Sequence, residues 1–471
     1  MVLKFHDRDD ELSYLSERYR SDQFEFFVIY GRRRVGKTEL IKRFIQNRTF
    51  LYYLCDKSGT ERNSIRLKKQ IAETINEPVI ETNDLEEIIE YYLKRTRGLS
   101  PIIVFDEFSY LVEKDASIPS LFQRIVDEQL RYSDVLLILC GSSISMMEKG
   151  VLSAKSALYG RKTAHLKLKE IPFSAMPLFF PNNSIEKNME FYAVLGGVPF
   201  YLQRFSDKKT TWENIQAQIL DKTGYLYEEI DFLLREELRE PDTYKTILQA
   251  IATGRSKLVD IANASQIKAN DIDKYLKILI RLGIIAKCHP IDKQTSKKTI
   301  YTISDNFFAF YFSFSEPYHS SIEIGEIAEV KQRFEEQFSA YVGKRFEKLI
   351  RDEILWKLPG ITPQRVGQWW GAYKDTGTGE RKEAEIDIIA IDETKNHMIF
   401  GECKWQNKPM GVKTYEQLLF KKDLVEWKRN TRTESFVLFS KNGFTKELRK
   451  KAEDANIFLY DLKDIPAILR L

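Results

Sequence analysis

The strongest chemical signal in the sequence is a glycine-rich loop that ends in a lysine and a threonine. It matches GxxxxGK[ST], and its members are Gly31, Arg32, Arg33, Arg34, Val35, Gly36, Lys37 and Thr38. An apolar run at 24–30 precedes the loop and a helical pattern follows it, which is the strand–loop–helix setting that such a loop requires. Backbone amides at a glycine loop and a helix N-terminus bind phosphate oxygens. We therefore expect Lys37 to contact the β- and γ-phosphates of ATP and the Thr38 hydroxyl to ligate Mg²⁺.

Two further strand ends fit the same chemistry. The apolar run 102–105 ends in Asp106 and Glu107, and Asp106 follows Lys37 by 69 residues. We expect Asp106 to hold Mg²⁺ and Glu107 to act as the general base on the attacking water. Such a pair of acids is also ordinary turn chemistry, but the phosphate loop upstream favours the catalytic interpretation. A third run at 135–141 is followed by Ser142 and Ser143, which either sense the γ-phosphate or cap the next helix.

A second constellation lies near the C-terminus, where Asp387 is followed by Glu402 and Lys404 with the spacing D-x14-E-x-K. Each acid stands in a strand-like apolar run. Adjacent strands would bring two carboxylates and a lysine to one site, where hard oxygen ligands hold Mg²⁺ and the metal activates water against a phosphodiester. Alternation along a strand places Glu402 and Lys404 on one face. The alternative is that these residues are strand-end charges.

Short apolar runs must position the residues of the predicted ATP site. The runs at 24–30, 50–55, 101–107 and 135–141 lack polar alternation, which is typical of parallel strands buried on both faces. After residue 166 helical periodicity dominates, and strand patterns return at 385–391, 397–405 and 435–440. The sequence thus predicts an α/β protein of several domains.

Composition excludes several classes. The 471 residues carry 73 Lys+Arg against 69 Asp+Glu, and a net charge of +4 requires any nucleic-acid surface to be local. The four cysteines are scattered without a CxxC pair, so neither a disulfide scaffold nor a cysteine zinc site is expected. The apolar runs fall far short of the ~20 residues of a membrane helix, and the N-terminus is charged where a signal peptide is apolar. We expect a cytoplasmic protein with no membrane partner.

Residues 241–312 show three helical patterns followed by a hairpin, which is typical of a winged helix. Its third helix would present Lys268, Lys274 and Lys277, and its hairpin tip Lys293, Lys297 and Lys298. These lysines could contact DNA phosphates. Asp271 and Asp273 on the same helix repel phosphate, so packing within the chain is the alternative.

The phosphate loop, Asp106–Glu107, the strand ending at Ser142 and LYGR at 158–161 together resemble prokaryotic, mainly archaeal, P-loop ATPases between the AAA+ and STAND groups. FxxRxxEL from Phe5 to Leu12 resembles the box that opens those proteins near the adenine. Gly196-Gly197-Val198-Pro199 and Tyr201 resemble the GxP element of their lid. The resemblance implies a γ-phosphate sensor or arginine finger at Arg161, from the same chain or from a neighbour in a homo-oligomer. The alternative is an arginine with a purely structural part.

The C-terminal constellation resembles the PD-(D/E)XK nuclease fold, which implies a further acid on the preceding helix, where Glu347 stands. Glu385 and Gln417 would be neighbours of the site. The tryptophans of this region either stack bases or belong to the core or an interface: Trp369, Trp370, Trp405 and Trp427.

The predicted division is a P-loop ATPase core at 1–165, a helical lid at 166–240, a winged helix at 241–312, a connector at 313–340 and a mixed α/β restriction-endonuclease-like domain at 341–471. The leading hypothesis is an ATP-hydrolysing switch coupled to a DNA-directed, Mg²⁺-dependent nuclease. The alternatives are a STAND-like regulator with a C-terminal domain that only binds, and a winged-helix transcription factor with ATP as its ligand.

Overall fold

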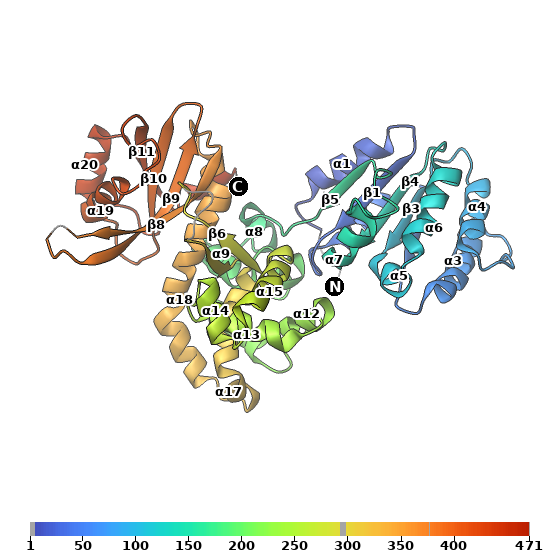
Figure 1. Cartoon of the computed structure of the whole chain (residues 1–471), viewed down its shortest axis with the longest axis horizontal. Helices are drawn as coiled ribbons and strands as arrows, with labels where there is room; N and C mark the ends of the chain where they lie inside the picture. Colours follow the sequence, from blue (N-terminus) through green and yellow to red (C-terminus); the bar gives the residue numbers. More distant parts are fainter. Residues whose placement is uncertain (1–4, 293–297, 376, 471) are drawn as a thin grey trace. The chain divides into compact units, whose positions relative to one another are not determined.

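The computed structural model describes residues 5–292, 298–375 and 377–470, which form two compact units (Figure 1). The first unit comprises the chain up to Ile171 together with Val198–Phe200, and the second comprises Pro172–Gly197 and Tyr201 onward. Within the described ranges no helix is both long and apolar enough to cross a membrane.

The first unit is built on a five-stranded sheet in the order β2-β3-β4-β1-β5, with every neighbouring pair parallel. Its strands are β1 (Glu25–Tyr30), β2 (Phe50–Leu54), β3 (Ile102–Asp106), β4 (Leu136–Gly141) and β5 (Ala164–Lys167). This confirms the predicted parallel sheet and its first four strands. The short fifth strand was not predicted, because only four residues pair there and half of them are polar.

Helices cover both faces of this sheet, as the uninterrupted apolar strands require. They are α1 (Asp9–Tyr19), α2 (Lys37–Ile45), α3 (Thr60–Ile75), α4 (Leu85–Arg95), α5 (Ser109–Lys114), α6 (Ile118–Arg124) and α7 (Ile144–Met147), with π-helical turns η1 (Ile125–Leu130) and η2 (Glu148–Leu152). Alternate side chains of β1 enter the two cores: Phe26 and Val28 pack with α3 and α4, whereas Phe27 and Ile29 pack with α1 and α2.

The second unit begins with helices and one hairpin. They are α8 (Met176–Phe179), α9 (Ile185–Leu195), α10 (Pro199–Leu202), α11 (Thr211–Ile215), α12 (Glu229–Glu237), α13 (Pro241–Ala252), α14 (Leu258–Ala264), α15 (Ala269–Arg281), β6 (Ile285–Cys288), β7 (Ile300–Ile303), α16 (Asn306–Phe310), α17 (His319–Glu323) and α18 (Ala328–Leu349). α10 starts in the segment assigned to the first unit. The order of α13 to β7 is three helices and an antiparallel pair. Lys293 and Lys297 lie outside the described residues.

The second unit ends in a five-stranded mixed sheet in the order β12-β11-β10-β9-β8. Its elements are β8 (Arg365–Lys374), β9 (Arg381–Asp392), β10 (His397–Lys404), α19 (Val412–Lys422), β11 (Thr433–Ser440), α20 (Lys446–Asp454), β12 (Ile457–Asp461) and α21 (Ile465–Leu469). β9 is antiparallel to both of its neighbours, β8 and β10, whereas β10, β11 and β12 are parallel. The predicted mixed α/β character is confirmed. The two edge strands, β8 and β12, were not predicted from the sequence.

Two predicted domain limits fall inside regular elements. The limit at 165 lies within β5, and the limit at 340 lies within α18, which runs without interruption from Ala328 to Leu349. The composition of the sequence does not change where β5 or α18 ends. A single element such as α18 can pack against two different groups of elements, so composition alone does not locate these limits.

Candidate functional site

The glycine-rich loop connects β1 to α2 at the carboxyl end of the parallel sheet. At Gly31 a side chain would collide with the carbonyl oxygen of Leu168, so only glycine fits where the loop leaves the strand. Gly36 precedes α2 with φ 92°, a left-handed conformation that glycine adopts without strain. The loop is therefore shaped by two positions at which a side chain is excluded or strained.

Lys37 lies inside this loop and is only 6% exposed. Its ammonium group donates to the carbonyl oxygens of Gly31 at 2.9 Å and Arg32 at 2.8 Å. The positive charge is thus held against the loop whose amides would receive phosphate oxygens, which fits the predicted contact with the β- and γ-phosphates.

The other loop residues are braced by specific partners. Arg32 pairs with Glu170 at 3.2 Å, and Arg33 donates to the Tyr110 hydroxyl at 3.0 Å. The guanidinium of Arg34 lies 4.1 Å from the centre of the Phe200 ring. Phe200 follows Pro199 of the predicted GxP element, so this element contributes a residue to the surroundings of the loop.

Arg8 of the FxxRxxEL box has a role that the sequence did not indicate. Its side chain is buried and donates to the carbonyl oxygens of Val35 at 3.2 Å and Lys169 at 2.8 Å, while it pairs with Glu11 at 2.7 Å. Arg8 therefore ties the phosphate loop to the segment after β5. Only its position within the box could have signalled this contact.

Asp106 is fully buried at the end of β3 and accepts three hydrogen bonds. Its Oδ2 accepts from the hydroxyls of Thr38 and Tyr52, both at 2.7 Å, and its Oδ1 accepts from the amide of Glu107 at 2.9 Å. A hydroxyl and a carboxylate in direct contact are the hard oxygen ligands that Mg²⁺ takes, so Thr38 and Asp106 fit the predicted magnesium site.

Glu107 is the next residue and has φ 53°, an uncommon conformation for a residue other than glycine. Its Oε2 accepts from the Ser142 hydroxyl at 2.6 Å and from the Ser142 amide at 3.3 Å. Ser143 occupies the position before α7 without a side-chain capping bond. Of the two alternatives for these serines, the contact of Ser142 with Glu107 favours a part in the nucleotide site.

Arg161 contacts an acid of its own unit. Its Nε and Nη2 donate to the Asp127 carboxylate at 2.9 and 2.7 Å, and its Nη1 donates to the Ala157 carbonyl at 2.9 Å. This interaction agrees with the structural alternative for the residue. Its part as a γ-phosphate sensor or arginine finger stays a prediction.

The C-terminal constellation lies on two adjacent strands. Asp387 belongs to β9, and Glu402 and Lys404 belong to β10, which pairs with β9 in antiparallel fashion. The Lys404 ammonium lies 2.9 Å from Glu402 Oε1 and 4.0 Å from Asp387 Oδ2. Asp387 Oδ2 also accepts the amide of Cys403 at 3.0 Å. The structure therefore brings both acids and the lysine together.

A bulge in β9 determines how Asp387 is presented. Gly367 of β8 pairs with Ile389, but Trp369 pairs with Ile386, so two residues of β9 oppose one residue of β8. Asp387 is one of those two, and a bulge redirects side chains locally. Simple alternation of side chains along β9 therefore does not hold at this residue.

α18 and the segment directly after it each supply one charged group to the constellation. Arg351, just after α18, donates to the carbonyl oxygen of Asp387 at 2.8 Å. Burial raises the pKa of Glu347 to about 7, and the charge of Asp387 adds to the rise. Burial also raises the pKa of Asp387 to about 6, with Glu402 as the second cause. Glu347 is thus close enough to Asp387 for their charges to interact, as the nuclease resemblance implied.

A lysine of α19 completes the surroundings of Glu402, and the sequence analysis missed it. Lys421 lies 3.3 Å from both carboxylate oxygens of Glu402. The predicted neighbours Gln417, one turn earlier on α19, and Glu385 are both exposed. Lys421 is four residues after Gln417, so the two share one face of the helix, and this spacing could have indicated Lys421 from the sequence.

No group of three or more His, Cys, Asp or Glu side chains among the described residues is arranged to hold a metal, so the metal-ligand roles of Asp387, Glu402 and Glu347 stay predictions.

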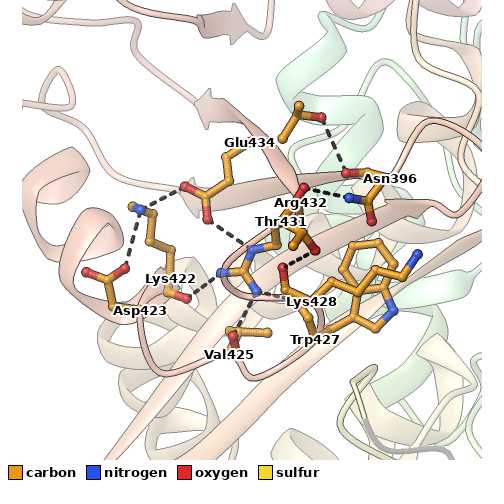
Figure 2. Close-up of polar contacts among 10 residues, drawn as sticks. Asn396, Lys422, Asp423, Val425, Trp427, Lys428, Thr431, Arg432 and Glu434 are labelled. Carbon is orange, nitrogen blue, oxygen red and sulfur yellow. Dashed lines mark hydrogen bonds and ion pairs between the residues drawn. The ribbon is translucent and has the colours of Figure 1, made fainter.

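Arg432 fixes the end of the helix that carries Lys421 (Figure 2). Its side chain is fully buried and pairs with Glu434 at 3.0 Å. It also donates to the carbonyl oxygens of Lys422, Val425 and Trp427, at 2.9, 2.8 and 2.6 Å. Because Lys422 is the last residue of α19 and the other two residues lie just beyond it, Arg432 holds the end of the helix next to Lys421.

The two residues before the undescribed part of the hairpin pack within the second unit. Ile291 donates its amide to the Gln368 carbonyl at 3.0 Å, and Asp292 accepts from the Trp369 indole at 3.1 Å. On α15, Lys277 pairs with Asp273 at 2.6 Å, whereas Lys268 and Lys274 are exposed at its start and middle, and Lys298 is exposed beyond the hairpin tip. These contacts favour intramolecular packing for this segment over DNA contact.

The tryptophans of the C-terminal region are held mainly by protein contacts. Trp369 is buried, and Trp405 packs on Phe346 with ring centres 5.2 Å apart. Trp370 and Trp427 are half-buried. For Trp369 and Trp405 these contacts favour the core or interface alternative over base stacking.

The raised pKa values lead to a prediction for stability. Between about pH 4 and pH 7 the folded chain holds more protons on Asp387 and Glu347 than the unfolded chain, so the free energy of unfolding falls as the pH rises. Asp387→Asn should therefore stabilise the second unit by about 2 kcal/mol at pH 8 and by much less at pH 4. Urea unfolding followed by tryptophan fluorescence measures this, because all 6 tryptophans lie in the second unit.

Glu383→Gln is the matched control, since Glu383 is an exposed acid on the same strand. A stabilisation by Asp387→Asn that was equal at pH 4 and pH 8 would show that the buried charge is not its cause.

Comparison with known proteins agrees with the geometry of the first unit. The profile of an ATPase domain found predominantly in Archaea matches residues 5–205. A domain of unknown function matches residues 186–308, and a family of archaeal and bacterial proteins of unknown function matches residues 311–418. An uncharacterised protein of Methanocaldococcus jannaschii is 38% identical over 427 residues, which are 89% of this chain and 91% of that protein.

Solved structures with a similar chain include a Walker-type ATPase of Pyrococcus abyssi, with a TM-score of 0.49 and 19% identity over 65% of this chain and 96% of that one. The ORC2 protein of Aeropyrum pernix has a TM-score of 0.45 and 15% identity over 68% of this chain and 95% of its own. Similarity at this level carries no functional argument. The sequence matches and the loop on its parallel sheet confirm the resemblance seen in the sequence: the chain belongs, with its M. jannaschii relative, to the P-loop ATPases of archaeal type.

Proposed function

We propose that the chain is an ATP-driven switch whose C-terminal domain cleaves DNA phosphodiester bonds with the help of Mg²⁺. The single observation that carries the nuclease part is the meeting of Asp387, Glu402 and Lys404 on adjacent strands, with Lys404 within 4.0 Å of both carboxylates. The raised pKa of Asp387 supports this proposal, since buried carboxylates that repel each other favour a divalent cation.

In this proposal each residue of the C-terminal site has a distinct task. Asp387 and Glu402 would supply oxygen ligands, and a divalent ion there would polarise the scissile phosphate and lower the pKa of a water. Lys404 would steady the attacking oxygen or the developing negative charge. Lys421 would hold Glu402 in place through its two contacts, and Glu347 would add a third carboxylate from its helix.

In the ATPase site, Thr38 and Asp106 would hold Mg²⁺, and Glu107 would take the proton of the attacking water. Ser142 donates to Glu107 and would orient it. Arg161 would approach the γ-phosphate after leaving Asp127, from its own chain or from a neighbour. The proposed chain has the five domains predicted from the sequence. Its ATPase core continues through β5, and its nuclease-like domain starts within α18.

A second candidate function is a regulator whose C-terminal domain binds DNA or protein without cutting. The two lysines at Glu402 favour it, because Lys404 and Lys421 already neutralise an acid that would otherwise attract a cation. A transcription factor that reads DNA with its hairpin has less support, since Ile291 and Asp292 at the start of the hairpin tip contact β8.

The deciding experiment is a cleavage assay on the full chain. Plasmid, linear duplex and single-stranded DNA are incubated with Mg²⁺ or Mn²⁺, with and without ATP, and the products are resolved on gels. We expect metal-dependent cleavage that Asp387→Asn reduces to background, because the ligand charge is lost while the side chain keeps its size.

Glu383→Gln should cut as the wild type does, and Asp387→Asn should hydrolyse ATP at the wild-type rate. Metal-dependent DNA binding without cleavage in the wild type would replace the nuclease proposal with the binding-only function.

A further inference from the structure

A tyrosine on strand β2 completes the hydrogen bonding of the buried acid in the ATPase site. Asp106 Oδ2 accepts from two hydroxyls at 2.7 Å, those of Thr38 and Tyr52. Thr38 belongs to the phosphate loop, whereas Tyr52 belongs to neither the loop nor any motif of the sequence. The third donor to Asp106, the Glu107 amide, takes the other carboxylate oxygen.

The strand geometry explains why Tyr52 reaches this carboxylate. β2 lies beside β3 in parallel register, with Leu54 opposite Asp106. Consecutive side chains of a strand point to opposite faces, so Tyr52 lies on the face that packs with α2, and Tyr53 lies on the face that packs with α3 and α4. The Tyr53 hydroxyl accordingly donates to Asn63 at 2.9 Å, away from Asp106.

The hydroxyl of Tyr52 is the donor in its 2.7 Å hydrogen bond with Asp106 Oδ2. A neutral donor at a buried carboxylate stabilises the ionised acid and limits its rotation without neutralising its charge.

We propose that Tyr52 is a positioning residue for the divalent cation of the ATPase site. It fixes the Asp106 carboxylate in the orientation in which Thr38 and Asp106 together present oxygen ligands. This inference rests on the magnesium site of the proposed function. Mg²⁺ demands near-ideal octahedral geometry, so a carboxylate that is free to rotate should bind it less well. Loss of an outer hydrogen-bond partner of a metal ligand typically costs 10- to 100-fold in metal affinity.

The test measures metal binding directly, without turnover. Mn²⁺ serves as the probe, because its electron paramagnetic resonance signal falls on binding, and it is titrated into the full chain with and without saturating ADP. Only the binding that ADP adds is assigned to the ATPase site, because Asp387 and Glu402 form the second proposed metal site. Tyr52→Phe removes only the hydroxyl and should weaken Mn²⁺ binding about 10-fold. Tyr53→Phe, the same change one residue later on the same strand, should bind Mn²⁺ as the wild type does. Thermal melts of both variants establish that they are folded.

The outcomes separate this inference from the proposed site. If ADP added no Mn²⁺ binding to the wild-type chain beyond that of free ADP, the proposed magnesium site would fail and this inference with it. If the wild type bound Mn²⁺ and Tyr52→Phe bound it equally well, only the role of Tyr52 would be overturned. Equal weakening in both variants would also overturn it, because the effect would then belong to the strand as a whole.

Discussion

Glu107→Gln is expected to bind ATP as tightly as the wild type and to hydrolyse it at least about 100-fold more slowly. The amide keeps the size of the side chain and a polar contact with Ser142, but it cannot accept the proton of the attacking water. The Ser142 hydroxyl lies 2.6 Å from Glu107 Oε2, so the proposed base is already oriented in the folded chain. Phosphate release measures the rate, and calorimetry with ATP measures binding.

The matched control for this change is Glu113→Gln, because Glu113 is an exposed acid on α5 of the same unit. It should leave both quantities unchanged. Hydrolysis by Glu107→Gln at the wild-type rate would show that another residue is the base.

The second large effect concerns binding itself. Lys37→Ala should weaken ATP binding by about 10- to 100-fold, because a charged hydrogen bond to phosphate is worth about 1.5–3 kcal/mol. Lys37 donates to the carbonyls of Gly31 and Arg32, so the change also removes a support of the loop. Titration with ATP by calorimetry gives the affinity.

Lys42→Ala provides the comparison, since Lys42 is an exposed lysine one turn further along the same helix. Wild-type affinity in Lys37→Ala would exclude this lysine from the phosphate site. A loss of affinity in both variants would point instead to the net charge of α2.

The phosphate loop is a part of the site that could be predicted from residues adjacent in the chain. Its glycines, lysine and threonine stand in a fixed order between an apolar strand and a helix, so the loop and its ligand class follow from neighbours in the chain. The same holds for Asp106 and Glu107, because a buried parallel strand delivers its last residues to the carboxyl edge of the sheet.

The contacts that brace this site could not be predicted, because they join distant segments. Arg8 reaches the carbonyls of Val35 and Lys169, and Tyr52 reaches Asp106 from the neighbouring strand. Both depend on strand order and on which way a side chain leaves its element. Tyr52 has no type or spacing that distinguishes it from the other tyrosines of the chain, and the FxxRxxEL box marks Arg8 without specifying its partners.

At the C-terminal constellation the sequence determined the residues and the strands, through the acids set in apolar runs at 385–391 and 397–405. Only the tertiary structure decided how Asp387 is presented, because the bulge in β9 depends on the register with β8. It also decided that Lys421 contacts Glu402, since that contact requires the packing of α19 on the sheet. Local pattern thus determined which groups are present in this protein, and long-range packing decided which of them meet.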